Sequence, residues 1–161
     1  MRRSPAAWLG LMLLTLLALP ANAAAHAYLD QATPPMESVV RAQPSIVRLA
    51  FTEPVEVNFS TFKVYPVPWE EPAETLPPEE RNLRIRAAAS QLVGEALGRR
   101  GDEAERADAG VATNQNISDV VVIRLKEDLP PGPYAVMWRV LSIDTHITSG
   151  FYFFTYEPAD G

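Results

Sequence analysis

The sequence predicts an all-β protein, an antiparallel β-sandwich of about seven strands with one helical insertion. Several short segments alternate apolar and polar residues with a period of two, which is the pattern of strands. The chain has 161 residues, of which 47% are hydrophobic and 21% charged, so a globular domain is expected rather than a disordered chain. Fifteen prolines against eight glycines argue against a helical bundle and favour strands joined by stiff turns.

The first 25 residues have the pattern of a secretory signal peptide. Arg2 and Arg3 precede an apolar run that is broken by Pro20 and followed by small residues. The run is shorter than the roughly 20 residues that cross a bilayer, so an uncleaved anchor is the less favoured alternative. A peptidase that selects small residues could cut after Ala25 or after Ala23. The first cut would make His26 the N-terminus of an exported, soluble domain spanning residues 26–161.

Five segments of the mature chain are expected to be strands. They are Ile46–Phe51, Phe62–Tyr65, Val120–Leu125, Tyr134–Val140 and Phe151–Tyr156. Proline-rich turns separate them, and the last strand is aromatic on both faces, as a fully buried strand would be. The expected sandwich is therefore Ig-like in the general sense.

The middle of the chain, Pro66–Ser118, is rich in proline and charge and is expected to be an insertion. Within it, Glu79–Arg100 is predicted to be a helix, with Pro78 in its first turn, two glutamates at its start, two arginines at its end and Gly101 as a cap. Its apolar stripe favours packing on the sandwich over binding a partner. The stretch Asp102–Asn116 is predicted to be a mobile loop.

Composition excludes several classes of function. The formal net charge of -6 argues against a nucleic-acid-binding protein, which would need a basic face. The absence of cysteine excludes disulfides, thiolate metal sites and cysteine nucleophiles. The sequence contains neither a Gly-rich phosphate loop nor a Gly-x-Ser-x-Gly elbow. A Ser-His-Asp triad is not excluded by composition, but no serine lies in a nucleophile signature.

The two histidines are the candidate metal ligands. An N-terminal His26 would offer its α-amine and its imidazole from a single residue. Asp144 and His146 are two residues apart, so on an extended backbone they point to the same side. Nitrogen and oxygen ligands of this kind suit Cu(II). An isolated Asp-x-His is common and rarely marks a metal site. The copper site is indicated because both histidines of the chain lie where they could serve as ligands.

Four stretches of the chain together resemble the CopC family of exported bacterial copper-binding proteins. They are His26–Leu29 with Thr33–Pro35, Val47–Val55, Leu129–His146 and Thr148–Phe154. The Trp-Arg-Val-x-Ser-x-Asp-x-His run in the third stretch is far more specific than Asp-x-His alone.

The resemblance implies a cupredoxin-like or Ig-like Greek-key sandwich and a Cu(II) site formed by His26, Asp144 and His146. It also implies that Glu53 lies near the metal, although Glu53 could equally be a turn residue before Pro54, and that Trp138 packs in the core beneath the site. Thr145 stands where the family usually has glycine, which we expect an extended segment to tolerate. The insertion is longer than is usual for the family, and the methionine-rich Cu(I) loop of some members is missing, so a two-site shuttle is not expected.

The resulting expectation is a periplasmic Cu(II)-binding protein, not an enzyme, that buffers or delivers copper in copper homeostasis and resistance. The resemblance implies a CopD-type membrane copper importer as a partner. One alternative is a histidine-clamp copper oxygenase resembling a lytic polysaccharide monooxygenase. Another is a metal-free Ig-like interaction module.

Overall fold

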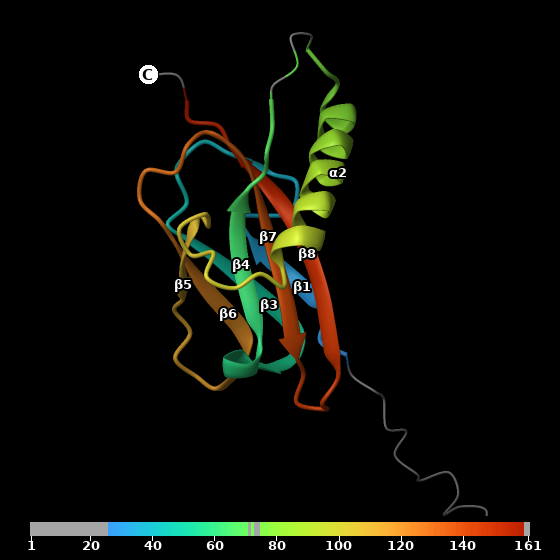
Figure 1. The fold of residues 1–161 in the computed structure, drawn as a ribbon, viewed down its shortest axis with the longest axis vertical. Coiled ribbons are helices and arrows are strands. Elements are labelled where there is room, and N and C mark those ends of the chain that lie inside the picture. The colour runs from blue at the N-terminus through green and yellow to red at the C-terminus, as the bar shows by residue number, and fades with distance from the viewer. Residues whose placement is uncertain (1–25, 71, 73–74, 160–161) are drawn as a thin grey trace, which may run out of the picture.

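Two four-stranded β-sheets pack face to face in this protein, and one helix covers the outer face of the second sheet (Figure 1). The structure is a computed structural model that describes residues 26–70, 72 and 75–159. The predicted signal peptide, residues 1–25, lies outside the described residues. The all-β sandwich predicted from the sequence is confirmed.

The first sheet has the strand order β1-β3-β6-β5, and all its pairs are antiparallel. Its strands are β1 (Leu29–Thr33), β3 (Ile46–Glu56), β6 (Ile117–Leu125) and β5 (Asp108–Val111). The second sheet has the order β2-β8-β7-β4, in which the edge pair β2–β8 is parallel. Its strands are β2 (Val39–Val40), β8 (Ile147–Tyr156), β7 (Gly132–Leu141) and β4 (Thr61–Pro66). The described residues therefore form eight strands where about seven were expected.

The main core lies between the two sheets and follows the alternation read from the sequence. Val47, Leu49 and Phe51 of β3 are 0%, 0% and 5% exposed, and they face apolar residues of β7 and β8. Trp138 of β7 belongs to this core and meets the ring of Phe51 edge-on, with ring centroids 6.1 Å apart. The burial of Trp138 agrees with its predicted place in the core.

The helix α2 (Pro78–Ala96) packs on the outer face of the second sheet. Its buried Ala89 and Ala96 contact a cluster that includes Tyr65 and Met137 of the sheet, so β4 and β7 are buried on both faces. Pro78 lies in the first turn, as predicted. The expectation that the helix packs on the sandwich is confirmed.

The helix ends at Ala96, so the predicted end at Arg100 is wrong. The buried Lys63 of β4 donates hydrogen bonds to the carbonyl oxygens of Ala96, at 2.9 Å, and Arg99, at 2.6 Å. Carbonyl groups at a helix end need such partners. A lysine from a distant strand supplies them here, and the two arginines lie beyond the helix.

The segment Asp102–Asn116 is not the predicted mobile loop, because it contains β5 and two buried carboxylates, Asp102 and Asp108. Asp102 accepts hydrogen bonds from Lys63, at 2.6 Å, from Arg106, at 2.8 Å, and from the hydroxyl of Tyr65. Burial alone would raise the pKa of Asp102, but these bonds outweigh it and hold that pKa well below its usual range. The segment is thus fixed to β4.

Candidate functional site

The predicted ligands Asp144 and His146 lie in the tight turn between β7 and β8. The N–H of Ser142 donates to the carbonyl of His146, and the N–H of Thr145 donates to the carbonyl of Ser142, both at 2.9 Å. The expected extended segment is therefore wrong. Asp144 and His146 come together because the chain reverses between them, and not because a strand has a period of two.

Thr145 occupies the left-handed region of the backbone, with φ at 71°. A β-branched residue is strained there, because its Cβ crowds the backbone. The turn, unlike an extended segment, accounts for the glycine that is usual at this position. The turn needs a positive φ at the position where the resemblance led us to expect glycine.

The side chains of Asp144 and His146 face each other across the turn. The backbone N–H of His146 donates to Asp144 Oδ1 at 3.1 Å, and His146 Nδ1 lies 3.0 Å from Asp144 Oδ2. The backbone N–H is the main reason that the pKa of Asp144 lies below its usual range, and the nearby imidazoles of His146 and His26 lower it further. Oδ2 is shielded from solvent, and Nδ1 of His146 is in contact with it. A metal ion that binds this carboxylate would have to replace that contact.

The structure brings His26 to this turn. The ring centroids of His26 and His146 are 4.7 Å apart, with an angle of 46° between the ring planes. His26 precedes β1 and His146 lies between β7 and β8, so the two histidines are far apart in the chain. Sequence reasoning named both residues, but it could not show that they are neighbours.

Three hydroxyl groups, which sequence reasoning missed, fix the backbone next to His26. Thr52 donates to the carbonyl of His26 at 3.3 Å, and Thr148 donates to the carbonyl of Ala27 at 2.8 Å. Ser142 accepts the N–H of Ala27 at 3.4 Å. All three hydroxyls lie in the stretches that carry the family resemblance, but nothing in those stretches indicates their partners.

Glu53, the predicted neighbour of the metal, is half-buried in β3 beside Pro54. The carbonyl of Pro54 accepts the N–H of Ile143 at 3.4 Å, which places this part of β3 against the turn. Within the described part of the chain, the carboxylate of Glu53 makes no hydrogen bond or ion pair with which to assign it a role.

The donor set fits a copper ion by its chemistry. Two imidazoles and a carboxylate are nitrogen and oxygen donors of the kind that Cu(II) prefers. Across residues 26–70, 72 and 75–159, no three His, Cys, Asp or Glu side chains already converge on one point. A bound ion would therefore require these side chains to reorient, and the side chain of His146 is 52% exposed.

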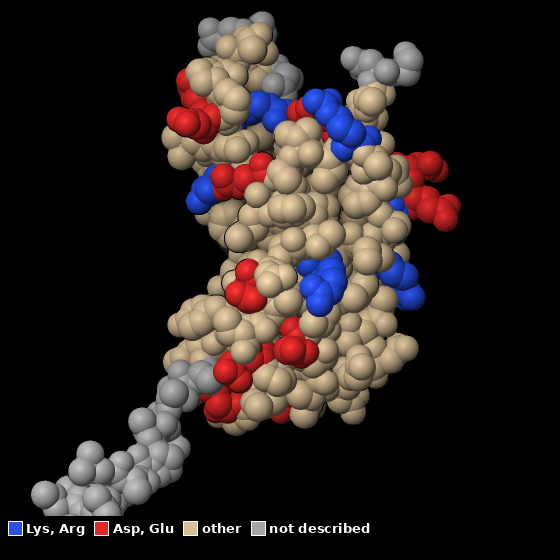
Figure 2. Space-filling model, turned by 180° about the vertical axis from the view of Figure 1, so that it is seen from behind, with Lys and Arg blue, Asp and Glu red and all other residues tan. Residues whose placement is uncertain are grey.

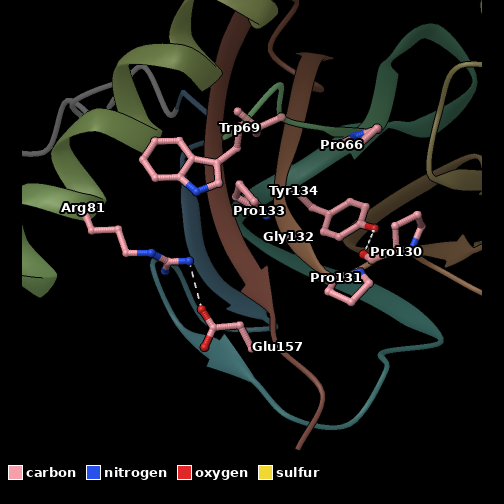
Figure 3. A pocket seen from close by; sticks show the side chains of 10 residues that line it. Pro66, Trp69, Arg81, Pro130, Pro131, Gly132, Pro133, Tyr134 and Glu157 are labelled. Carbon is pink, nitrogen blue, oxygen red and sulfur yellow. Dashed lines mark hydrogen bonds and ion pairs between the residues drawn. The ribbon is translucent and has the colours of Figure 1, made fainter. Parts of the chain in front are cut away.

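A hollow of about 490 Å³ lies at the opposite end of the sandwich, where β7 begins and β8 ends (Figure 3). The charged side chains that line it interact with each other. Arg81 forms an ion pair with Glu157 at 2.9 Å, and its guanidinium carbon lies 6.0 Å from the centre of the Trp69 ring. The residues lining this hollow include no histidine, so it is separate from the candidate metal ligands.

Within the described residues, no helix is both long and apolar enough to cross a membrane.

Comparison with protein families gives a match to the family model described as CopC domain, over residues 29–96 and 81–157. The copper transport protein CutJ of Bacillus subtilis is 26% identical over 154 residues, which are 96% of this chain and 22% of that protein. The chain thus spans about a fifth of the length of this relative. Protein YobA of Escherichia coli K12 is 28% identical over 131 residues, covering 81% of this chain and 78% of that protein.

Two solved structures share the fold. CopC from Methylosinus trichosporium OB3b matches with a TM-score of 0.56 and 24% identity, over 84% of this chain and 98% of that chain. PcoC, a methionine-rich copper resistance protein from Escherichia coli, matches with a TM-score of 0.53 and 27% identity, over 83% of this chain and 100% of that chain.

Proposed function

This chain belongs to the CopC family, and from that premise we propose that it is an exported protein that binds Cu(II) and buffers or delivers it in the periplasm. In this role it serves copper homeostasis and resistance. Copper is its cargo, and the protein is a binder and not an enzyme.

The observation that carries the proposal is the 4.7 Å separation of the His26 and His146 rings, with the Asp144 carboxylate beside His146. If export exposes His26 as the first residue, its α-amine joins its own imidazole as a second donor. A single cargo ion would then have an amine nitrogen, two imidazole nitrogens and a carboxylate oxygen within reach. Among divalent first-row ions, Cu(II) binds such a set most strongly.

The printed names of the relatives support copper as the cargo. CutJ is named a copper transport protein and PcoC a copper resistance protein. Since this chain spans only 22% of CutJ, transport across a membrane is not carried over from it. Delivery to a separate membrane importer of the CopD type is the corresponding proposal for this chain.

The carboxylate also favours binding over oxygenase chemistry. A hard oxygen donor at 3.0 Å from His146 stabilises Cu(II) relative to Cu(I), whereas an oxygenase must cycle between the two states. A site of this kind holds and releases Cu(II) without turnover.

The test is isothermal titration with Cu(II) of two proteins, one beginning at His26 and one that retains Ala24 and Ala25. We expect one tight site in the first protein and much weaker binding in the second, since the added residues remove the free amine from His26. Binding should also weaken as the pH falls below neutrality, because imidazoles and amines must lose protons before they bind a metal. Absence of a one-to-one event in the first protein would end the proposal. Mass spectrometry of the exported protein identifies its first residue.

A further inference from the structure

Exposed apolar side chains gather at the end of the sandwich that carries the candidate copper ligands. We call this region the hairpin end and define it as residues 26–30, 52–60, 113–119 and 141–149. It holds five large apolar side chains that are more than half exposed: Phe59 (75%), Tyr28 (63%), Ile147 (57%), Ile117 (53%) and Ile143 (52%). Single exposed apolar residues are ordinary, but several at one end of a monomer indicate an interaction surface.

Backbone contacts join the segments of the hairpin end. The 3-10 turn η1 (Val57–Phe59) donates the N–H of Val57 to the carbonyl of Asn116 at 2.8 Å, next to Ile117. The hydroxyl of Ser60 accepts the N–H of Leu141 at 3.1 Å. Phe59 and Ile117 are therefore held beside the turn that carries Ile143, Asp144 and His146.

Acidic residues predominate at the hairpin end. Its segments contain the acidic residues Asp30, Glu53, Glu56, Asp119 and Asp144, and they contain no lysine or arginine. Acidic side chains gather at the lower end of the molecule in the view of Figure 2, with basic side chains just above them. The exposed Arg139 of β7 pairs with Ser149 of the hairpin end, so one basic side chain borders the acidic residues and leaves them in excess.

These observations narrow the choice of occupant. A second copy of the chain would bring two acidic ends together, and an anionic membrane surface would meet the same repulsion. A protein surface that is basic and apolar complements the exposed apolar side chains and the acidic charge of the hairpin end. Apolar contacts would supply the buried interface area, and opposite charges would orient the partner and speed association.

We propose that the hairpin end is the docking surface for a protein partner whose contact surface is basic and apolar, and that the partner exchanges the copper cargo there. The exchange step rests on the proposed function, because it places the partner directly over His26 and His146. The docking itself depends only on the apolar and acidic side chains. An experiment can therefore disprove the docking or the copper exchange separately.

The test uses two synthetic probes, an amphipathic helical peptide of leucine and lysine and a matched peptide of leucine and glutamate. Each is titrated into the isotope-labelled protein, and amide shifts are followed by NMR. We expect the lysine peptide to shift residues of the hairpin end, with binding that weakens as salt is raised from about 0.05 M to about 0.5 M. The glutamate peptide should bind at least tenfold more weakly.

Variants at exposed positions separate docking from copper binding. Phe59→Ser and Ile117→Ser should weaken binding of the lysine peptide about tenfold and leave Cu(II) affinity unchanged. The matched changes Ile46→Ser and Leu83→Ser, at exposed residues on other surfaces, should leave peptide binding unchanged. Melting curves of all four variants confirm that they fold.

Three outcomes would overturn the proposal. They are equal binding of the two peptides, amide shifts centred on α2 instead of the hairpin end, and sedimentation showing a dimer that Phe59→Ser dissociates. Loss of Cu(II) binding in the unmodified protein, with peptide docking intact, would instead overturn the proposed function alone.

Discussion

The imidazole rings of His26 and His146 lie 4.7 Å apart, although 120 residues separate them in the chain. The contact exists because the turn after β7 and the residues before β1 meet at one end of the sandwich. Binding of an ion between the rings would therefore require both the segment before β1 and the turn after β7.

Removing one of the proposed ligands from the turn should weaken Cu(II) binding with little effect on the fold. We expect His146→Ala and Asp144→Asn each to reduce Cu(II) affinity by about 100-fold, or about 2.8 kcal/mol, in isothermal titration. Asp119→Asn, the same change at an exposed carboxylate nearby, serves as the control and should change nothing. Equal affinities for Asp144→Asn and Asp119→Asn would remove Asp144 from the site.

The hydroxyl of Thr148 should position His26 through the backbone of Ala27. In Thr148→Val the carbonyl of Ala27 loses its donor at 2.8 Å, so we expect about tenfold weaker Cu(II) binding, or about 1.4 kcal/mol. Faster hydrogen exchange at the amides of Ala27 and Tyr28 should accompany the change. Ser38→Ala removes a comparable hydroxyl bond, to the carbonyl of Pro35 at 2.7 Å, and should leave copper affinity intact. A Thr148→Val protein that loses stability but keeps full affinity would show a purely structural role.

Thr145→Gly should stabilise the protein, because glycine adopts a φ of 71° without strain. The substitution removes about 1–2 kcal/mol of strain from the left-handed backbone conformation. The greater conformational entropy of glycine in the unfolded chain offsets about 0.5–1 kcal/mol of this. Denaturant unfolding should therefore show a net gain of about 0.5–1 kcal/mol. Thr145→Ala keeps a Cβ and should gain much less. Similar gains for alanine and glycine would mean that the turn is not strained by its Cβ.

Gly150→Ala should destabilise the protein, because the ring of Trp138 lies directly over this glycine. A Cβ built at Gly150 would stand 2.5 Å from Cζ2 of Trp138. Overpacking of this kind costs about 1–3 kcal/mol in unfolding free energy. Gly94 lies on the exposed side of α2, and a Cβ built there would meet no neighbouring atom within 4 Å. Gly94→Ala should therefore raise the unfolding free energy by about 0.5–1 kcal/mol. Tolerance of Gly150→Ala without a shift of the Trp138 fluorescence would contradict this packing.

Asp102 should make the stability of the protein sensitive to acid. Its pKa is lowered in the folded state, so its contribution is fully present above the ordinary carboxyl pKa of about 3.9 and is lost as the pH falls below that value. We expect the unfolding free energy to fall steeply between about pH 4 and pH 2. Asp102→Asn should lower stability at neutral pH, because Lys63 is left buried without its partner, and should make the acid slope shallower. An unchanged slope in Asp102→Asn, with Asp119→Asn as the reference, would show that other carboxylates control acid unfolding.

Local pattern was sufficient for much of the fold. The alternation of Val47, Leu49 and Phe51 predicted their buried face, and Pro78 predicted the start of the helix. Pattern failed where a distant residue decided the outcome. Lys63 bonds the carbonyl at the helix end, and the carboxylates of Asp102 and Asp108 fix a charged segment that resembled a mobile loop.

The sequence by itself determined which atoms could serve as donors, because the chemistry of an imidazole or a carboxylate belongs to the residue. It also indicated the five strands β3, β4, β6, β7 and β8, since a period of two is a local property of the chain, but it did not indicate β1, β2 or β5. Only the tertiary structure decided that His26 lies beside His146, and that a reversing turn, strained at Thr145, brings Asp144 into contact with His146. Those distances result from packing between segments far apart in the chain, and no local pattern encodes such packing.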